Sequence, residues 1–106
     1  MDTRIKAIIT KLRQSLETLY GRRLAHLVLF GSQARGRKKP DSDIDILVVL
    51  RGEVNPFEEI STTGKITAEL SLKYTTVISC TFISEDRYNT EQSPLLLNVR
   101  REGIPA

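Results

Sequence analysis

The chain has 106 residues, which is enough for one compact domain with an apolar core and too few for two. Its 16 basic and 13 acidic residues give a net charge of +3, too small by itself to indicate a nucleic-acid or membrane partner. The sequence shows no signal peptide and no apolar run of about 18 residues, and the single Cys80 excludes an internal disulfide. We therefore expect one cytoplasmic domain over residues 1–106, with no membrane contact and no direct binding of nucleic acid.

The first expected element is a helix that begins at Asp2 or Thr3 and ends at Gly21. Apolar residues recur along it at helical spacing: Ile5, Ile8, Ile9, Leu12, Leu16 and Leu19. A buried strand over residues 24–30 is expected next, because this short apolar run ends at a glycine. We expect the helix to pack on the sheet to which this strand belongs.

A glycine and a serine follow this strand directly. Gly31 permits backbone angles and close approaches that a side chain would block, and Ser32 offers a hydroxyl and a backbone N–H group. A short helical turn over residues 33–35 is expected after them. Free N–H groups at a helix start favour an anion, so this turn is predicted to hold phosphate. Basic residues stand beside it in the sequence: Arg35, Arg37, Lys38 and Lys39.

Two aspartates open the second apolar run, which extends to Leu50. Side chains two apart in a strand share a face, so Asp43 and Asp45 should point the same way while Ile44 and Ile46 enter the core. Adjacent carboxylates repel each other, and a divalent cation relieves that repulsion. Mg²⁺ is typically held by one or two carboxylates together with phosphate oxygens. A phosphate cradle that faces paired carboxylates indicates metal-assisted phosphoryl or nucleotidyl transfer.

Each part of this pattern also has a purely structural interpretation, as a turn or as a solvated loop. A calcium-binding EF-hand is excluded, because Ile46 stands where that loop needs glycine and Gly52 where it needs glutamate. Neither the Walker-type nor the dinucleotide-binding glycine pattern occurs. The lone His26 is interpreted as structural or surface-exposed, and Cys80 as an inert buried thiol.

The second half of the chain continues the alternation of helices and strands. A helix is expected over residues 56–73, capped by Asn55 and with its apolar side formed by Phe57, Ile60, Gly64, Ala68, Leu70 and Leu72 or Tyr74. Residues 61–64 weaken its centre, where it could bend. A third strand over residues 76–83 is rich in β-formers and nearly uncharged, so it should be central or well covered. The helix between the second and third strands makes these two strands parallel.

The last residues are expected to form a polar loop with a helical turn over residues 85–92 and a final short helix. This helix begins after Ser93 and ends at Gly103. Its three consecutive leucines, at positions 95–97, are equally compatible with a partner surface and with burial. The expected order of elements is therefore α-β-α-β-α-β-α.

The segment LFGSQARGRKKPDSDIDILVV at residues 29–49 resembles the minimal nucleotidyltransferases of the DNA polymerase β-like superfamily. Their signature is the pair Gly31-Ser32, ten residues, and then Asp43-Ile44-Asp45. The resemblance implies an α/β (α+β) fold with a small mixed sheet flanked by helices, in which the first two strands are antiparallel. It also implies that Asp43 and Asp45 are catalytic and bind Mg²⁺, and that Gly31, Ser32 and Arg35 bind ATP.

Stand-alone members of this family are often encoded beside a small all-helical HEPN-domain protein, a presumed ribonuclease toxin. The resemblance therefore implies an antitoxin that forms a hetero-oligomer with this toxin and transfers AMP from ATP to a hydroxyl, such as that of a tyrosine, on it. The family generally places a third carboxylate on the strand after the second helix, and residues 77–81 hold none. Glu85 and Asp86 are the nearest alternatives. An antitoxin that only binds the toxin, and a transferase acting on a small molecule, are the competing hypotheses.

Overall fold

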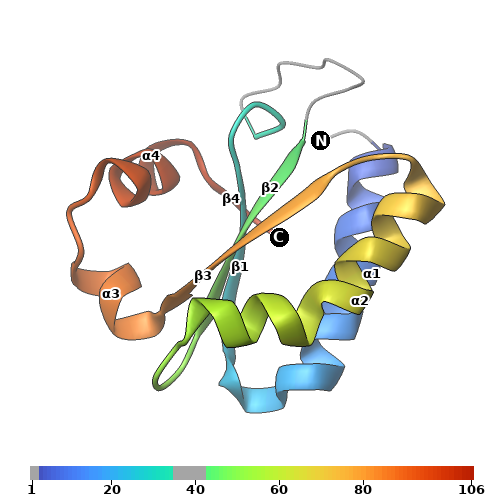
Figure 1. The fold of residues 1–106 in the computed structure, drawn as a ribbon. Helices are drawn as coiled ribbons and strands as arrows, with labels where there is room; N and C mark the ends of the chain where they lie inside the picture. The colour runs from blue at the N-terminus through green and yellow to red at the C-terminus, as the bar shows by residue number, and fades with distance from the viewer. Residues whose placement is uncertain (1–2, 35–42) are drawn as a thin grey trace.

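A computed structural model describes residues 3–34 and 43–106 of the chain (Figure 1). Its elements follow in the order α1 (Thr3–Tyr20), the 3-10 turn η1 (Gly21–Arg23), β1 (Leu24–Phe30), β2 (Ile44–Leu50), α2 (Pro56–Tyr74), β3 (Ile78–Ser84), α3 (Glu85–Thr90), α4 (Pro94–Glu102) and β4 (Ile104–Pro105). The predicted mixed α/β fold is confirmed, with strand and helix bounds within two residues of those expected.

Four strands form one mixed sheet in the order β3-β2-β1-β4. β1 and β2 are antiparallel and β2 and β3 are parallel, as predicted. The short β4 pairs antiparallel with β1 through Ile104 and Pro105 and was not predicted. A two-residue strand that contains proline has almost no pattern by which a sequence could reveal it.

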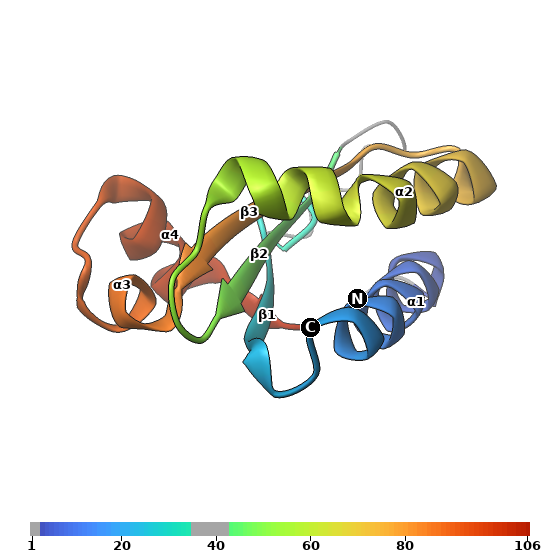
Figure 2. The same cartoon turned by 60° about the horizontal axis from the view of Figure 1, so that its bottom comes forward.

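Helices α1 and α2 cover one face of the sheet, which we call the covered face (Figures 1 and 2). The predicted apolar stripe of α1 is buried there, except that Leu19 is partly exposed. It packs against side chains of alternate strand positions: Leu27, Leu29, Ile44, Ile46, Val48, Leu50, Ile78 and Phe82. This cluster is the larger part of the core, and its burial supplies most of the apolar stabilisation of the fold.

Helices α3 and α4 lie on the opposite face, which we call the open face (Figures 1 and 2). Here Leu96 and Val99 of α4 pack with Val28, Leu47, Val49 and Ile83 of the sheet. Leu95 and Leu97 remain partly exposed, so only one of the three consecutive leucines is fully buried. Toward the start of β2 and β3 the same face is accessible, because Asp43, Ser79 and Thr81 are exposed.

The buried side of α2 differs from the predicted one. Phe57, Ile60 and Leu72 are exposed, whereas Glu59 and Thr63 are buried. The reason is that polar partners make their burial tolerable: the Tyr20 hydroxyl and the Arg23 guanidinium donate to Glu59 at 2.9 and 3.1 Å, and the Thr63 hydroxyl donates to the Glu59 carbonyl at 2.8 Å. The helix is continuous over residues 61–64, where a weak centre was predicted.

The prediction that the third strand is central or well covered is wrong. β3 stands at the edge of the sheet. Ile78, Cys80 and Phe82 pack on the covered face beneath α2, but Ser79 and Thr81 are exposed on the open face and Val77, just before the strand, is 55% exposed. The uncharged sequence of β3 therefore reflects burial of only one of its two faces. Burial raises the pKa of the Cys80 thiol to about 12, as expected for an inert thiol.

Candidate functional site at the start of β2

The antiparallel pairing of β1 and β2 places the end of one strand beside the start of the other. Phe30 pairs with Asp45, so Gly31 follows immediately next to this carboxylate. Gly31 has a φ of +75°, which side-chain-bearing residues rarely adopt. A Cβ atom at this position would lie 3.2 Å from Asp45 Cγ and would overlap Oδ2. Glycine is therefore required at position 31 for two reasons: the backbone angle, and the close approach of the Asp45 carboxylate.

The residues after Gly31 form a turn. Ser32, Gln33 and Ala34 are half-buried and form a turn, and the last residue of the predicted helical turn, Arg35, is not among the described residues. The remainder of the predicted phosphate cradle, including Arg35 and the basic residues at positions 37–39, lies outside the described residues. The pairing of β1 with β2 thus brings Gly31 next to the Asp45 carboxylate, and Ser32 follows in the adjoining turn.

The Asp45 side chain lies on the open face. Ile44 and Ile46 alternate with Asp45 along β2 and are completely buried on the covered face, so the Asp45 side chain points to the opposite side. Asp43 directly precedes the strand and is exposed, whereas Asp45 is half-buried. Carboxylate oxygens are the ligands that Mg²⁺ prefers. Among the described residues, Asp43 and Asp45 are therefore the candidate ligands for a hard cation at this end of β2.

The neighbouring strand adds no carboxylate to the pair. Ser79 of β3 stands directly opposite Asp45, and its side chain is exposed on the same face. Ser84, which precedes Glu85 and Asp86, pairs with Leu50 at the other end of β2. Five residues of strand separate the two levels, or about 17 Å. Glu85 also lies 3.9 Å from Arg51. The suggestion that Glu85 or Asp86 completes the site is therefore wrong, and no group of three potential metal ligands occurs among the described residues.

His26 takes no part in this site. It pairs with Val49, toward the far end of β2, and its ring lies 5.2 Å from that of Tyr88 on α3. This position confirms its interpretation as a structural or surface residue, since Ser32 lies beyond the opposite end of β1.

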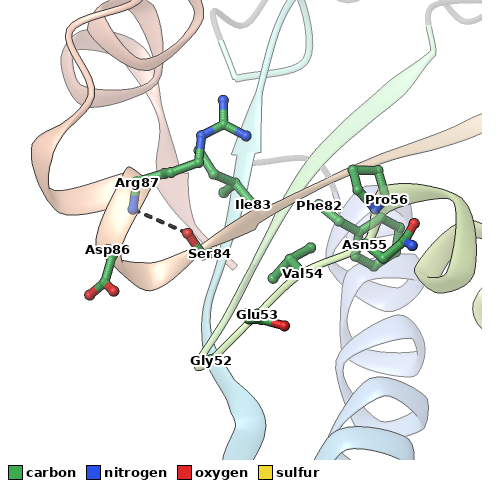
Figure 3. Close-up of a pocket in the computed structure, with 10 residues that line it drawn as sticks. All are labelled: Gly52, Glu53, Val54, Asn55, Pro56, Phe82, Ile83, Ser84, Asp86 and Arg87. Carbon is green, nitrogen blue, oxygen red and sulfur yellow. Dashed lines mark hydrogen bonds between the residues drawn. The ribbon is translucent and has the colours of Figure 1, made fainter.

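Two large hollows lie away from the aspartates. One, of about 510 Å³, opens where β2 and β3 end and is lined by residues 52–56 and by Phe82, Ile83, Ser84, Asp86 and Arg87 (Figure 3). The Ser84 hydroxyl accepts a hydrogen bond from the Arg87 backbone N–H there, at 3.2 Å, which caps α3. Most of the lining residues belong to the β2–α2 connection and to the cap of α3. We therefore interpret this hollow as a structural feature of the connection and not as part of the candidate site.

The second hollow, of about 610 Å³, surrounds the buried Glu59. Burial and the hydrogen bond to Glu59 raise the pKa of the Tyr20 hydroxyl well above its usual range. Sequence reasoning missed this group, because a glutamate and a tyrosine 39 residues apart carry no joint signal. The Glu59 carboxylate accepts hydrogen bonds from Tyr20 and Arg23. We therefore interpret it as a structural link between the end of α1 and the start of α2.

Comparison with known proteins identifies the class to which this arrangement belongs. Residues 9–96 match the model of the nucleotidyltransferase domain family. The chain therefore belongs to this family, and it is a nucleotidyltransferase. None of its described helices is both long enough and apolar enough to cross a membrane.

Two similar relatives are candidate protein adenylyltransferases of Methanocaldococcus jannaschii. One is 35% identical over 68% of this chain and 72% of its own length, and the other is 39% identical over 71% and 69%. Among solved structures, a chain from a toxin–antitoxin crystal structure with AMP-PNP superposes with a TM-score of 0.64. The aligned region covers 91% of this chain and 69% of the chain in that structure, with 19% sequence identity. At this level of identity the likeness shows the fold alone.

Proposed function

We propose that this chain is an antitoxin that transfers AMP from ATP to a hydroxyl group of a partner toxin, in an Mg²⁺-dependent reaction. The observation that carries the proposal is the close approach of Gly31 to the Asp45 carboxylate, with the exposed Asp43 two residues earlier in the chain. Support comes from the family itself, from relatives named as candidate protein adenylyltransferases, and from a fold shared with a toxin–antitoxin protein crystallised with AMP-PNP.

In this proposal Ser32 and the backbone N–H groups of its turn bind the triphosphate, and Arg35 offsets its negative charge. Asp43 and Asp45 hold Mg²⁺, which when bound polarises the α-phosphate and neutralises the leaving pyrophosphate. The acceptor oxygen attacks the α-phosphorus, the bond from that phosphorus to the bridging oxygen of the β-phosphate breaks, and pyrophosphate leaves. The acceptor hydroxyl gives up its proton to water or to a base of the partner, because β3 presents Ser79 and Thr81 in place of a carboxylate.

The proposed partner is an all-helical HEPN-domain ribonuclease toxin, and the proposed acceptor is a tyrosine on it. Both follow from the family resemblance. The open face suits a macromolecular acceptor, since the exposed Ser79 and Thr81 of β3 lie beside Asp45 and leave this end of the face accessible.

A second function is favoured by the serine opposite Asp45. A site whose described residues supply two carboxylates and no third one is also what an inert antitoxin would retain, if it neutralised the toxin only by covering it. Transfer to a small molecule is the remaining alternative, and activity on a free small hydroxyl compound without the partner would identify it.

Mass spectrometry of the partner toxin separates these functions. The toxin is incubated with this chain, ATP and Mg²⁺, and we expect its mass to rise by one or more AMP units. The double variant Asp43→Asn/Asp45→Asn should reduce this transfer by about a hundredfold or more, since a metal site supplies several kcal/mol of transition-state stabilisation. Asp86→Asn is the matched control, because this exposed aspartate lies at the far end of β3 and should leave transfer unchanged. A stable complex without any mass gain would contradict transfer and favour the binding function.

A further inference from the structure

The two edges of the sheet are built differently. At one edge, β4 is only two residues long and contains Pro105, which cannot donate a backbone hydrogen bond. At the other edge, β3 has seven residues, and residues 75–84 contain neither a charged residue nor a proline. Natural proteins usually protect exposed edges by charge, proline, bulges or short strands. β4 has this protection, whereas β3 has no charge, no proline and a full seven-residue length. An unprotected edge of this kind is typical of a strand that pairs with another chain.

The orientation of the β3 backbone shows which of its groups face outward. The Ile44 N–H donates to the Val77 carbonyl at 2.8 Å, so the odd-numbered residues of β3 direct their backbone groups toward β2. By alternation, the N–H and C=O groups of Ile78, Cys80 and Phe82 point to the free edge. Among residues 3–34 and 43–106, no strand pairs with this edge.

From these observations we infer that β3 pairs antiparallel with β3 of a second copy of the chain, about a twofold axis at Thr81. Thr81 is the middle residue of the strand, so this register overlaps all seven residues. It pairs Cys80 with Phe82 of the second copy, and Ile78 with Ser84. All four are outward-facing residues, as hydrogen-bonded antiparallel pairs require. The alternation of the backbone groups requires the axis to pass through a residue, and the full overlap of the two strands places it at Thr81.

The side chains favour a second copy over a charged partner. Self-pairing about Thr81 brings the two Thr81 side chains together at the axis, and opposed threonines stabilise antiparallel pairs. It opposes no like charges, because β3 is uncharged. On the covered face, Cys80 and Phe82 meet across the junction as two apolar side chains. An axis perpendicular to the sheet keeps the faces aligned, so the aspartates of both copies would open on the same side of one continuous sheet.

Charged substitutions at Thr81 test the inference through the mass of the assembly. Thr81 is exposed and points away from the core, so Lys and Glu are compatible with the fold. By sedimentation velocity over a dilution series, the native chain should have twice its 12.0 kDa monomer mass. Thr81→Lys and Thr81→Glu should each be monomeric, and their equimolar mixture should return to the dimer, because opposite charges then face each other at the axis.

The matched control is Thr10→Lys, which makes the same chemical change at an exposed position of α1 and should leave the dimer intact. Recovery of the dimer in the mixture also shows that both variants are folded. A native chain that stays at 12.0 kDa at every concentration would overturn the inference. A Thr81→Lys chain that dimerises as well as the native one would do the same.

Amide hydrogen exchange gives a second measurement within the same strand. In the native dimer, the outward-facing amides of Ile78, Cys80 and Phe82 should exchange slowly. In Thr81→Lys they should become fast, while Ser79 and Ile83, which bond to β2, stay protected in both. An unchanged exchange rate at the outward-facing positions would contradict pairing through β3, even if the chain dimerised through another surface.

Discussion

The two faces of the sheet divide stability and chemistry between them. The covered face is lined by completely buried aliphatic side chains beneath α1 and α2, and its polar groups, such as Glu59, are all satisfied. The open face is packed where α3 and α4 rest on it and presents Ser79 and Thr81 to solvent beside Asp45. Alternation along a single strand, β2, serves both: Ile44 and Ile46 belong to the core, and Asp45 between them belongs to the site.

The largest effect on stability is expected from a truncation on the covered face. Leu12 is completely buried in α1, so Leu12→Ala should lower the free energy of unfolding by about 2–5 kcal/mol. Leu19→Ala on the same helix is the control; its side chain is 42% exposed and its loss should cost clearly less. Urea denaturation measures both. Equal losses at the two positions would contradict the assignment of the core to this face.

A smaller loss of stability, joined to a loss of activity, is expected at Gly31. Gly31→Ala places a Cβ in a left-handed conformation, at a cost of about 1–2 kcal/mol, and displaces the Asp45 carboxylate. Gly52→Ala has the same kind of strain, with a φ of +84°, but nothing lies within 4 Å of the new Cβ. We expect similar losses of stability from the two variants, and at least about a tenfold loss of nucleotidyl transfer from Gly31→Ala alone. Equal activities would mean that the contact with Asp45 is unimportant.

The smallest effects should appear in the pH dependence of stability, and they differ between the faces. On the covered face, burial raises the pKa of Cys80 from 9.0 to about 12 and also raises that of Tyr20. The folded state therefore keeps these groups protonated, and stability should fall as the pH rises above about 9. Cys80→Ala and Tyr20→Phe should each flatten this alkaline decline, measured by the melting temperature. An unchanged slope would show that neither group shifts.

On the side of α3 and α4, hydrogen bonds from Arg87 and Ser93 lower the pKa of Glu91 below its usual 4.5. Its contribution is present above that value and is lost as the pH falls through the lowered pKa. Glu91→Gln should therefore weaken the acid-side decline slightly and leave the alkaline side unchanged. A change on the alkaline side would contradict this separation of the two faces.

Much of this organisation could be predicted from local sequence. The stripe of α1, the strand over residues 24–30, the caps at Asn55 and Ser93 and the alternation of Asp45 with isoleucines are signals within a few residues of one another. A close approach at Gly31 could also be anticipated from the glycine itself, although its partner, Asp45, is known only from the pairing of β1 with β2. These features need no knowledge of distant partners.

The errors concern features that depend on contacts between distant residues. The buried side of α2 is determined by Tyr20 and Arg23, which make a buried glutamate acceptable and leave Phe57 in solvent. The edge position of β3 depends on the order of the strands in the sheet. Composition does not predict this order, since a strand buried on one face can be as uncharged as a central one. The position of Glu85 and Asp86 depends on register: the chain distance from Ser79 is short, but the strand direction takes them to the other end of the sheet.

The pairing of β4 with β1 has a consequence for how the protein is made. Ala106 donates to the Leu27 carbonyl, and Ile104 pairs with Leu29, so strands 75 residues apart in the sequence meet. During synthesis on the ribosome, β1 and β2 can form their hairpin early, but one edge of β1 stays vacant until residues 104–106 have left the exit tunnel. Completion of the sheet is thus delayed by the time needed to translate the 75 residues that follow Leu29 up to Ile104. The nascent chain must in the meantime keep two hydrogen-bonding edges from pairing with its neighbours on the polysome.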